Sequence, residues 1–544
     1  MATMRSEARW IARCGYRRSI GSGKPAQRAT VGRDAHAAAA PFGTVALLVT
    51  LQFVASAASG QTWRVEPSTR ATVTATNNSG YVNGIDTSSD VVVELIPRLA
   101  LKGQSARFKL DAFVEADSLI YLNKSVTDEL NPRARLALNT TAIERWLYLD
   151  LGAGIQQVAG NPYVSVSNGN FPSIRLDTTQ YRLSPYLDHA FSPTVSVVYR
   201  NDNIWTRRND VIAAADPRRD SEFQSNTFAF TQRPIPFGYA VEANQERTKY
   251  TNSPDATLQL AAARAVLTYA FDPGLAVGLV AGRERNEFAS RTEYDSIRGM
   301  RLRWRPSERT DLNASVERRF FDTGWDVLWS HRSPFVAMNV NLNRQPASQP
   351  TSFLVPAAGG NFRSLVDAAY TTRFPNPVER AVIVDNAIAA FGASASATGP
   401  LEAYSDYAQV QQRATVSVAF LSPLTALTFQ LFNLKSEQLQ RNTAGTVPLP
   451  PTVADNTQLG GSVAFNRRLT STASIEAAVS GVKVEGIGAS QGLASSSKTV
   501  RLTGNQAIGP KTQVFAGARR QISKSTIVRS TQESALFLGI DHKF

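Results

Sequence analysis

The chain has 544 residues and a formal net charge of +14, with 43% hydrophobic and 19% charged residues. This length suits several soluble domains or one large barrel. A single cysteine, Cys14, excludes a disulfide framework, and the lack of a later run of 18 apolar residues argues against a helical membrane protein.

Residues 1–57 are predicted to form a secretory signal peptide with a long basic lead. Positions 1–34 carry eight Lys or Arg residues against two acidic ones, and the apolar run TVALLVTLQFVA follows at 44–55. That run is shorter than the roughly 20 residues that cross a bilayer as a helix. Ala55 and Ala57 fit a small-x-small cleavage site, so we expect cleavage after Ala57. The alternative, a short buried helix, lacks patterned residues around it to cover it.

Cleavage would remove Cys14 and six units of the positive charge. No long run of Lys or Arg and no nucleic-acid-binding signature follows the lead, so the basic composition does not indicate a nucleic-acid partner. We expect residues 58–544 to form the mature domain.

Residues 107–117, RFKLDAFVEAD, alternate with a period of two, which is typical of a strand with one apolar face. The charged residues that share the other face are Arg107, Lys109, Asp111, Glu115 and Asp117. Similar alternation recurs at 147–155, 300–305, 312–320, 414–420, 473–479 and 499–506. So many strands of this kind predict an all-β architecture.

Short turn signals separate the predicted strands, and most contain proline, which fits turn positions. They are FSPT (191–194), FDPG (271–274), RPSERTD (305–311), HRSPF (331–335), LSPLT (421–425), NRRLTS (466–471) and AIGPKT (507–512). Aromatic residues at or just before them suggest an interfacial girdle at one rim: Phe191, Phe271, Phe420 and Phe465. Longer polar connections, at 200–222 and 436–456, alternate with the short ones.

The period-two strands and the alternation of short and long connections predict a transmembrane antiparallel up-and-down β-barrel of about 20 to 22 strands. A soluble sandwich is the alternative, but small apolar residues on one face and both signs of charge on the other favour the barrel. In hydrocarbon only a closed sheet pairs every backbone group of its strands. We therefore expect the apolar face to contact lipid of a Gram-negative outer membrane, and the charged face to line a lumen.

The longest connection, 345–405, is predicted to be a partly helical loop or plug within the barrel. Apolar residues recur at three- and four-residue steps after Pro377, which favours an amphipathic helix that ends near Gly392. They are Ala381, Val384, Ile388 and Phe391. The alternative is a loop that only covers the rim.

The chain ends ALFLGIDHKF, which resembles the C-terminal assembly signal of bacterial outer-membrane barrels. Leu538, Ile540 and the terminal Phe544 fall on one face, whereas His542 stands where an apolar residue is usual. We therefore expect the barrel-assembly machinery to be a partner.

No catalytic, cofactor or metal site is predicted, and we expect no enzyme activity. His189, His331 and His542 are scattered near turns and the terminus, which gives little support to a metal cluster. The G-x-S-x-G match GASQG (488–492) lacks the flanking strand and helix of a nucleophile elbow, so Ser490 is interpreted as a flexible loop residue. Strands begin soon after the signal, which argues against the N-terminal plug domain of a TonB-dependent transporter.

Three arginines on alternate positions, Arg301, Arg303 and Arg305, carry the sharpest functional hypothesis, and Glu317 and Arg319 lie on the next predicted strand. Facing the lumen, the arginines would form a cationic ladder that attracts anionic sugar chains or phosphate-bearing solutes. The favoured alternative is that lumen arginines pair with Glu or Asp across strands and brace the wall.

Five segments spread over the mature chain carry a family resemblance: 63–81 (WRVEPSTRATVTATNNSGY), 90–103, 143–157, 177–200 and 373–392 (RFPNPVERAVIVDNAIAAFG). They resemble the outer-membrane β-barrel family associated with the PEP-CTERM/exosortase system, often encoded among exopolysaccharide genes. Where that family tends to have an Asp-Asn pair, this chain has Asn77 and Asn78. The resemblance implies a role beside exopolysaccharide production or export and brings no catalytic residues with it.

Two classes of function remain open at this point. One is a porin-like pore linked to exopolysaccharide export or to the exosortase/PEP-CTERM surface system, with exopolysaccharide or export-machine proteins as partners. The other is a non-conducting structural or assembly barrel plugged by the 345–405 insertion.

Overall fold

The computed structural model describes residues 62–79, 88–124, 127–159, 161–163, 175–209, 220–250, 253–288, 291–347, 409–439 and 455–544, together with Asp367, Thr371, Arg380 and Val384. The predicted signal peptide, 1–57, lies outside these residues. The elements whose bounds are described are 22 strands and one short 3-10 helix, η1 (Gly488–Ser490). The strands are β1 (Thr62–Thr76), β2 (Asp90–Gln104), β3 (Phe108–Tyr121), β4 (Glu129–Ile143), β5 (Leu147–Ala159), β6 (Arg175–Ala190), β7 (Val195–Asn209), β8 (Ser221–Gln232), β9 (Phe237–Tyr250), β10 (Ser253–Asp272), β11 (Leu275–Phe288), β12 (Arg291–Ser307), β13 (Thr310–Arg319), β14 (Asp322–Arg332), β15 (Val336–Ala347), β16 (Gln409–Leu421), β17 (Thr425–Gln438), β18 (Asn456–Arg468), β19 (Ala473–Gly486), β20 (Ala494–Ala507), β21 (Thr512–Ser525) and β22 (Thr531–Lys543).

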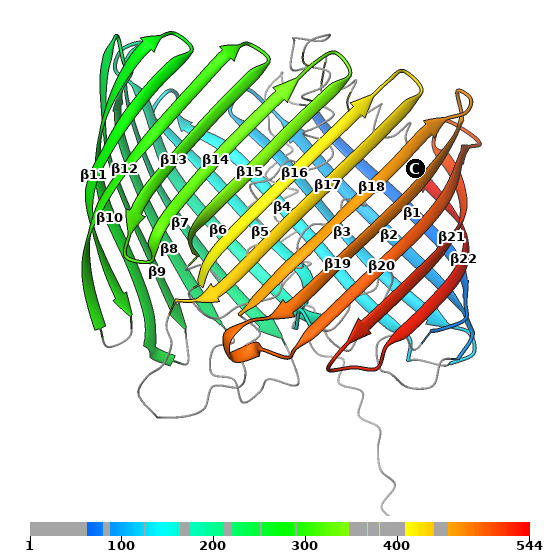
Figure 1. Ribbon diagram of the computed structural model, residues 1–544. Helices are drawn as coiled ribbons and strands as arrows, with labels where there is room; N and C mark the ends of the chain where they lie inside the picture. Colours follow the sequence, from blue (N-terminus) through cyan, green and yellow to red (C-terminus); the bar gives the residue numbers. More distant parts are fainter. Residues whose placement is uncertain are drawn as a thin grey trace, which may run out of the picture. The chain divides into compact units, whose positions relative to one another are not determined.

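The strands form one closed antiparallel sheet, as Figure 1 shows. Each strand pairs with its neighbours in the sequence, and β1 pairs with β22 from Ser68 opposite Lys543 to Thr76 opposite Ala535. Closure removes the sheet edge, so backbone groups that would face hydrocarbon are paired between strands. The predicted up-and-down barrel is confirmed, with a strand number at the upper end of the expected range. No helix in the described part of the chain is long and apolar enough to cross a membrane.

The period of two in the sequence separates an apolar outer face from a polar inner face. On β22, Leu536 and Leu538 are 66% and 62% exposed, whereas the alternate residues Glu533 and Phe537 are 3% and 7% exposed. Other strands repeat this pattern, with large apolar side chains exposed on the outside; examples are Val65, Val114, Leu267, Leu279, Met300, Val479 and Val500. An apolar exterior of this extent matches a hydrocarbon solvent.

Connections at the two rims differ in length. From even to odd strands the chain turns within two to four residues, at what we call the short-turn rim. All seven turns predicted from proline and turn chemistry lie there. From odd to even strands the connections lie at the long-loop rim and include the longest, 348–408.

Aromatic side chains gather on the outer face at the short-turn rim. Examples with between 37% and 64% exposure are Trp146, Phe191, Phe237, Phe271, Phe335, Phe420, Phe465 and Phe544. The three histidines of the predicted mature chain join them: His189 stacks on Trp146, His331 on Trp329, and His542 meets Phe544 edge-on. Such a girdle marks a membrane–water interface. The protein is therefore a β-barrel of the outer-membrane type, as its sequence predicts.

The predicted insertion begins later than expected. β15 continues to Ala347, opposite Gln409, so residues 345–347 belong to the strand. Most of the remaining insertion lies outside the described residues. Of the four that are described, Asp367, Arg380 and Val384 are helical, Arg380 Nε donates to Asp367 Oδ1 over 2.9 Å, and Val384 is fully buried.

Candidate functional site

The charged residues predicted on β3 occupy the face opposite the exposed Val114. Glu115 pairs with Arg98 at 3.2 Å and with Arg133 at 3.5 Å, and Asp117 pairs with Arg133 at 2.9 Å. Lys109 and Asp111 lie on the same side, nearer the short-turn rim, and both are exposed. Arg107 is different, because it lies in the turn before β3, where its backbone N–H donates to Ser105 Oγ.

The three arginines of the predicted ladder share the inner face of β12 but have different surroundings. Arg301 donates from Nη1 and Nη2 to the two carboxylate oxygens of Glu242, at 2.5 and 2.7 Å. Arg305 lies 3.9 Å from Asp311. Within the part of the chain that the structure describes, Arg303 has no carboxylate within 4 Å, and it is exposed.

Arg301 belongs to a larger network that we call the braced panel: Glu242 on β9, Arg264 on β10, Arg301 on β12 and Glu317 on β13. Arg264 Nε lies 3.0 Å from Glu317 Oε2, and Arg301 lies 3.6 Å from Glu317. The Arg301–Glu242 pair and the Arg264–Glu317 pair each reach over two intervening strands. The panel therefore connects five adjacent strands, β9 to β13, on the inside of the barrel.

Glycines let these side chains lie along the wall. Gly282 is the β11 residue opposite Arg264, and Gly299 is the β12 residue opposite Glu317. A Cβ atom at Gly299 would come within 2.9 Å of Glu317 Cγ. The side chains of Arg264 and Glu317 are only 10% and 12% exposed, so each charge depends on its partner. The bracing role predicted for lumen arginines fits Arg301 in this panel. The cationic-ladder hypothesis fits only Arg303, which is exposed and has no carboxylate within 4 Å among the described residues.

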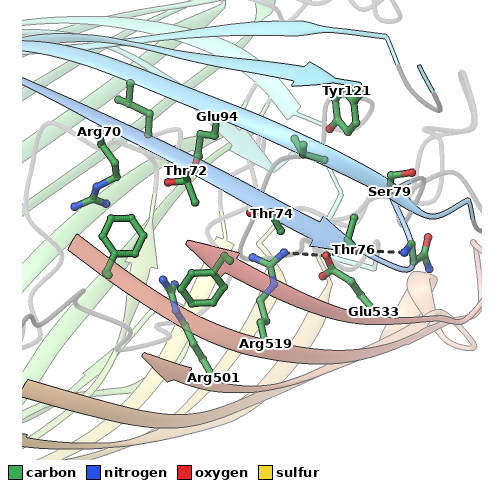
Figure 2. Close-up of a pocket in the computed structure, with 15 residues that line it drawn as sticks. Arg70, Thr72, Thr74, Thr76, Ser79, Glu94, Tyr121, Arg501, Arg519 and Glu533 are labelled. Atoms are coloured by element: carbon green, nitrogen blue, oxygen red, sulfur yellow. Dashed lines mark hydrogen bonds and ion pairs between the residues drawn. The ribbon is translucent and has the colours of Figure 1, made fainter. Parts of the chain in front are cut away.

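A second cluster surrounds the junction of the first and last strands, and we call it the seam pocket. It is a cavity of about 190 Å³ whose lining comes from β20, β21, β22, β1, β2 and β3. Figure 2 shows one end, where Arg519 Nη2 donates to Glu533 Oε1 over 2.8 Å and Thr76 Oγ1 donates to the same oxygen over 3.0 Å. Glu533 is buried, so this end is closed, while Arg70 at the other end is exposed.

Two phenylalanines lie flat on the wall of the seam pocket because glycines face them. Phe515 on β21 is opposite Gly539 on β22, and Phe537 on β22 is opposite Gly517 on β21. A Cβ atom at either glycine would collide with the opposite ring. Each ring carries an arginine: Arg501 lies 4.8 Å from the Phe537 centroid and Arg70 lies 5.6 Å from that of Phe515. The geometry is that of cation–π contacts.

A third feature reaches across the interior, and no sequence signal had indicated it. Tyr163, in the connection between β5 and β6, is fully buried against inward-facing Phe432, Val482 and Val484. Its hydroxyl donates to the backbone oxygen of Asp455 over 2.8 Å. Figure 1 places β5 and β17 to β19 on opposite sides of the barrel, so Tyr163 lies against the wall that faces β5.

Hydrogen bonds hold the residues beside Tyr163 in the same place. Ser495 Oγ donates to the Pro162 oxygen over 3.0 Å, and Ser525 Oγ donates to the Tyr163 oxygen over 2.8 Å. Burial raises the pKa of the Tyr163 phenol above its usual value. We call Asn161, Pro162 and Tyr163 the lumen tether.

The remaining predicted residues lie away from these clusters. Leu538, Ile540 and Phe544 point outward on β22 and at the chain end, and the Phe544 N–H donates to the Pro67 oxygen over 3.0 Å. Ser490 ends the 3-10 turn η1 between two strands and is buried, so its surroundings are not those of a nucleophile elbow. Among the described residues no group of three His, Cys, Asp or Glu side chains could hold a metal ion.

No protein-family model matches the chain, and no curated protein matches its sequence. Similar solved structures include the siderophore receptor PirA from Acinetobacter baumannii, with 9% identity over 88% of this chain and 80% of that one and a TM-score of 0.44. The FrpB iron transporter from Neisseria meningitidis is 9% identical over 88% and 81%, with a TM-score of 0.46. The copper transporter OprC is 12% identical over 88% and 81%, with a TM-score of 0.43. At these values the similarity supports no functional conclusion.

Proposed function

We propose that this protein is an outer-membrane pore for hydrophilic cargo, open at the short-turn rim and restricted at the long-loop rim. One observation carries the proposal: the closed sheet of 22 strands has a polar inner wall whose charged side chains are exposed toward the short-turn rim. Barrels of 16 to 18 strands already enclose an aqueous channel, so 22 strands enclose a wider one unless chain fills it.

The cargo that we propose is a polysaccharide or its sugar units. A wall that carries both signs of charge, many hydroxyl groups and a few aromatic rings suits polyhydroxylated chains, which donate and accept hydrogen bonds along their whole length. The resemblance to the exosortase-associated barrels supports the same cargo and links the pore to exopolysaccharide export.

Planar-bilayer recording tests the pore. Ala347 and Gln409 are paired directly, so a linker of about four residues can replace 349–407 without moving β15 or β16. We expect small, fluctuating conductance from the full mature chain and larger, steady conductance from the shortened one. Silence from both variants would remove the pore from consideration.

A second candidate, the non-conducting assembly barrel, is favoured by the burial of inner-wall polar side chains near the long-loop rim. Gln180, Thr248 and Asn286 are fully buried although they face the inside of a wide barrel. If the full chain is silent and only the shortened chain conducts, the plugged barrel is the native state and the 345–405 insertion is its plug.

Export is tested in cells. Deletion of the gene should lower surface polysaccharide, and the intact chain should restore it. The partnership with the barrel-assembly machinery has its own test, because Phe544→Ala should lower the amount of folded barrel in the outer membrane while the protein refolded in detergent stays normal.

A further inference from the structure

One arginine of the seam pocket, Arg501, has no carboxylate oxygen within 4 Å among the described residues, and the carboxylates of Glu476 and Glu94 act on it only from a greater distance. Arg70 is bound to Asp541 at 3.0 Å, and Arg519 is bound to Glu533 at 2.8 Å. Arg501 lies between them on the same wall, but in the described part of the chain it forms no ion pair, and its Nε donates to Thr503 Oγ1 over 3.2 Å. Its two terminal nitrogens are therefore available toward the cavity, where Figure 2 shows the guanidinium.

A carboxylate without an ion-pair partner lies on the other side of the same cavity. Glu94 on β2 lines the pocket beside Thr72, and among the described residues it too has no Lys or Arg nitrogen within 4 Å. Three strands, β21, β22 and β1, separate Arg501 from Glu94 along the wall. No ion pair joins the two charges, and both side chains line the cavity between them.

The shape of the cavity is built rather than accidental. Gly517 and Gly539 let the Phe537 and Phe515 rings lie flat, because any larger residue at either position would push a ring off the wall into the open space. The flat rings fix the two arginines in turn. A cavity needs only about 10–15 Å³ of such volume to hold one water, so about 190 Å³ leaves room for a small polar ligand.

We propose that the seam pocket binds a sugar unit that carries a carboxylate, such as a uronic acid residue of an acidic polysaccharide. The carboxylate accepts two hydrogen bonds from Arg501, whose guanidinium is held over Phe537 in a geometry suited to bidentate binding. Glu94 accepts hydrogen bonds from ring hydroxyls, and the exposed Arg70 end admits the ligand from the lumen. The inference deepens the proposed function by naming the cargo class, but binding does not require conductance.

Calorimetric titration of the folded mature protein in detergent tests the site with two probes, trigalacturonate and the neutral maltotriose. We expect trigalacturonate to bind and maltotriose to bind at least about tenfold more weakly, since a hydrogen bond to a charged group contributes about 1.5–3 kcal/mol. Arg501→Gln should weaken trigalacturonate binding by about ten- to a hundredfold and leave the weak maltotriose binding unchanged.

Arg520→Gln provides the matched control, because Arg520 follows Arg519 on β21 but faces outward, opposite Val500. It should bind trigalacturonate as the wild type does. Glu94→Gln keeps a side-chain oxygen that accepts hydrogen bonds from sugar hydroxyls, so the affinity for trigalacturonate should fall only a few-fold. Equal binding of the two probes, or unchanged binding in Arg501→Gln, would overturn the proposal. Binding of trigalacturonate by a barrel that does not conduct would contradict the proposed pore and still support the sugar site.

Discussion

The inner wall of the barrel is built differently at its two ends. Near the long-loop rim, Gln180 and Thr248 are 0% exposed, as in a protein core. Near the short-turn rim, Arg64 and Lys102 point from the same wall with side chains 77% and 54% exposed. Polar side chains are rarely buried without hydrogen-bond partners, and the Gln180 amide accordingly donates to Thr206 Oγ1.

This difference between the two ends separates control of passage from control of ion selection. A half that is packed like a core limits what passes, and a half whose charges remain in water determines which ions approach. The lumen tether contributes to the packed half, since it brings a buried aromatic ring against Phe432, Val482 and Val484 on the inner wall. Removing single interactions should therefore have large effects near the long-loop rim and small ones near the short-turn rim.

The largest effect is expected from Tyr163→Ala. Large-to-small changes of buried aromatic residues cost about 3–5 kcal/mol, and here the loss falls on the tether rather than on the barrel, whose backbone pairing is untouched. Hydrogen exchange of the Asn161–Tyr163 segment should become fast, and conductance should rise. Slow exchange in this variant would show that the tether is held without its tyrosine.

Tyr163 also predicts a pH dependence. Burial raises the pKa of the phenol in the folded state above 10, so the stability of the tether is complete below pH 10 and is lost as pH rises through the higher folded-state pKa. Conductance of the wild type should therefore increase at alkaline pH. Tyr163→Phe keeps the ring, loses the titratable group and serves as the control, because it should lack this alkaline rise.

The next effect concerns the braced panel. Glu317→Gln leaves Arg264, which is 10% exposed, without its carboxylate, and removing one partner of a buried pair costs about 3–5 kcal/mol. The temperature at which the folded band disappears on gels should fall. The double variant Arg264→Gln/Glu317→Gln removes both charges and should recover part of the loss; a double variant worse than the single one would contradict the pairing.

The fold was accessible from the sequence because its signals are local. Alternation on each strand reports the lipid-facing side directly, and turn residues such as Pro193 and Pro423 coincide with connections of three or four residues. The signals fail where alternation runs past the end of a strand. Arg107 continues the charged pattern of β3 but lies in the turn, because a polar residue suits both places.

The site was less accessible because its contacts are distant in the sequence. Arg301 was recognised as a lumen residue, but its partner Glu242 is 59 residues away and three strands along the sheet. Gly282 and Gly299 leave space for side chains that extend across their strands. The presence of a glycine in a strand does not predict which side chain will occupy that space. Tyr163 contacts Asp455 across 292 residues, for which no periodic pattern exists.

A smaller effect is expected from Arg303→Gln, which removes an exposed cation that no carboxylate within 4 Å balances among the described residues. The preference of the pore for anions should fall by about twofold, while the unfolding temperature stays constant. Arg301→Gln should instead lower the unfolding temperature and leave the anion preference nearly constant, since it breaks the hydrogen bonds to Glu242. Reversal potentials in a salt gradient give the first quantity, and heat-dependent gel mobility gives the second.

The smallest effect belongs to Lys102→Gln at the short-turn rim. Lys102 lies 3.2 Å from Glu66, but its side chain is 54% exposed, and ion pairs between such groups contribute about 0–1 kcal/mol because water and salt screen them. The free energy of unfolding should fall by less than about 1 kcal/mol, and the difference should vanish at high salt. A loss as large as that of Glu317→Gln would mean that the short-turn half is packed like the long-loop half, because only a buried partner makes the removal of one charge so costly.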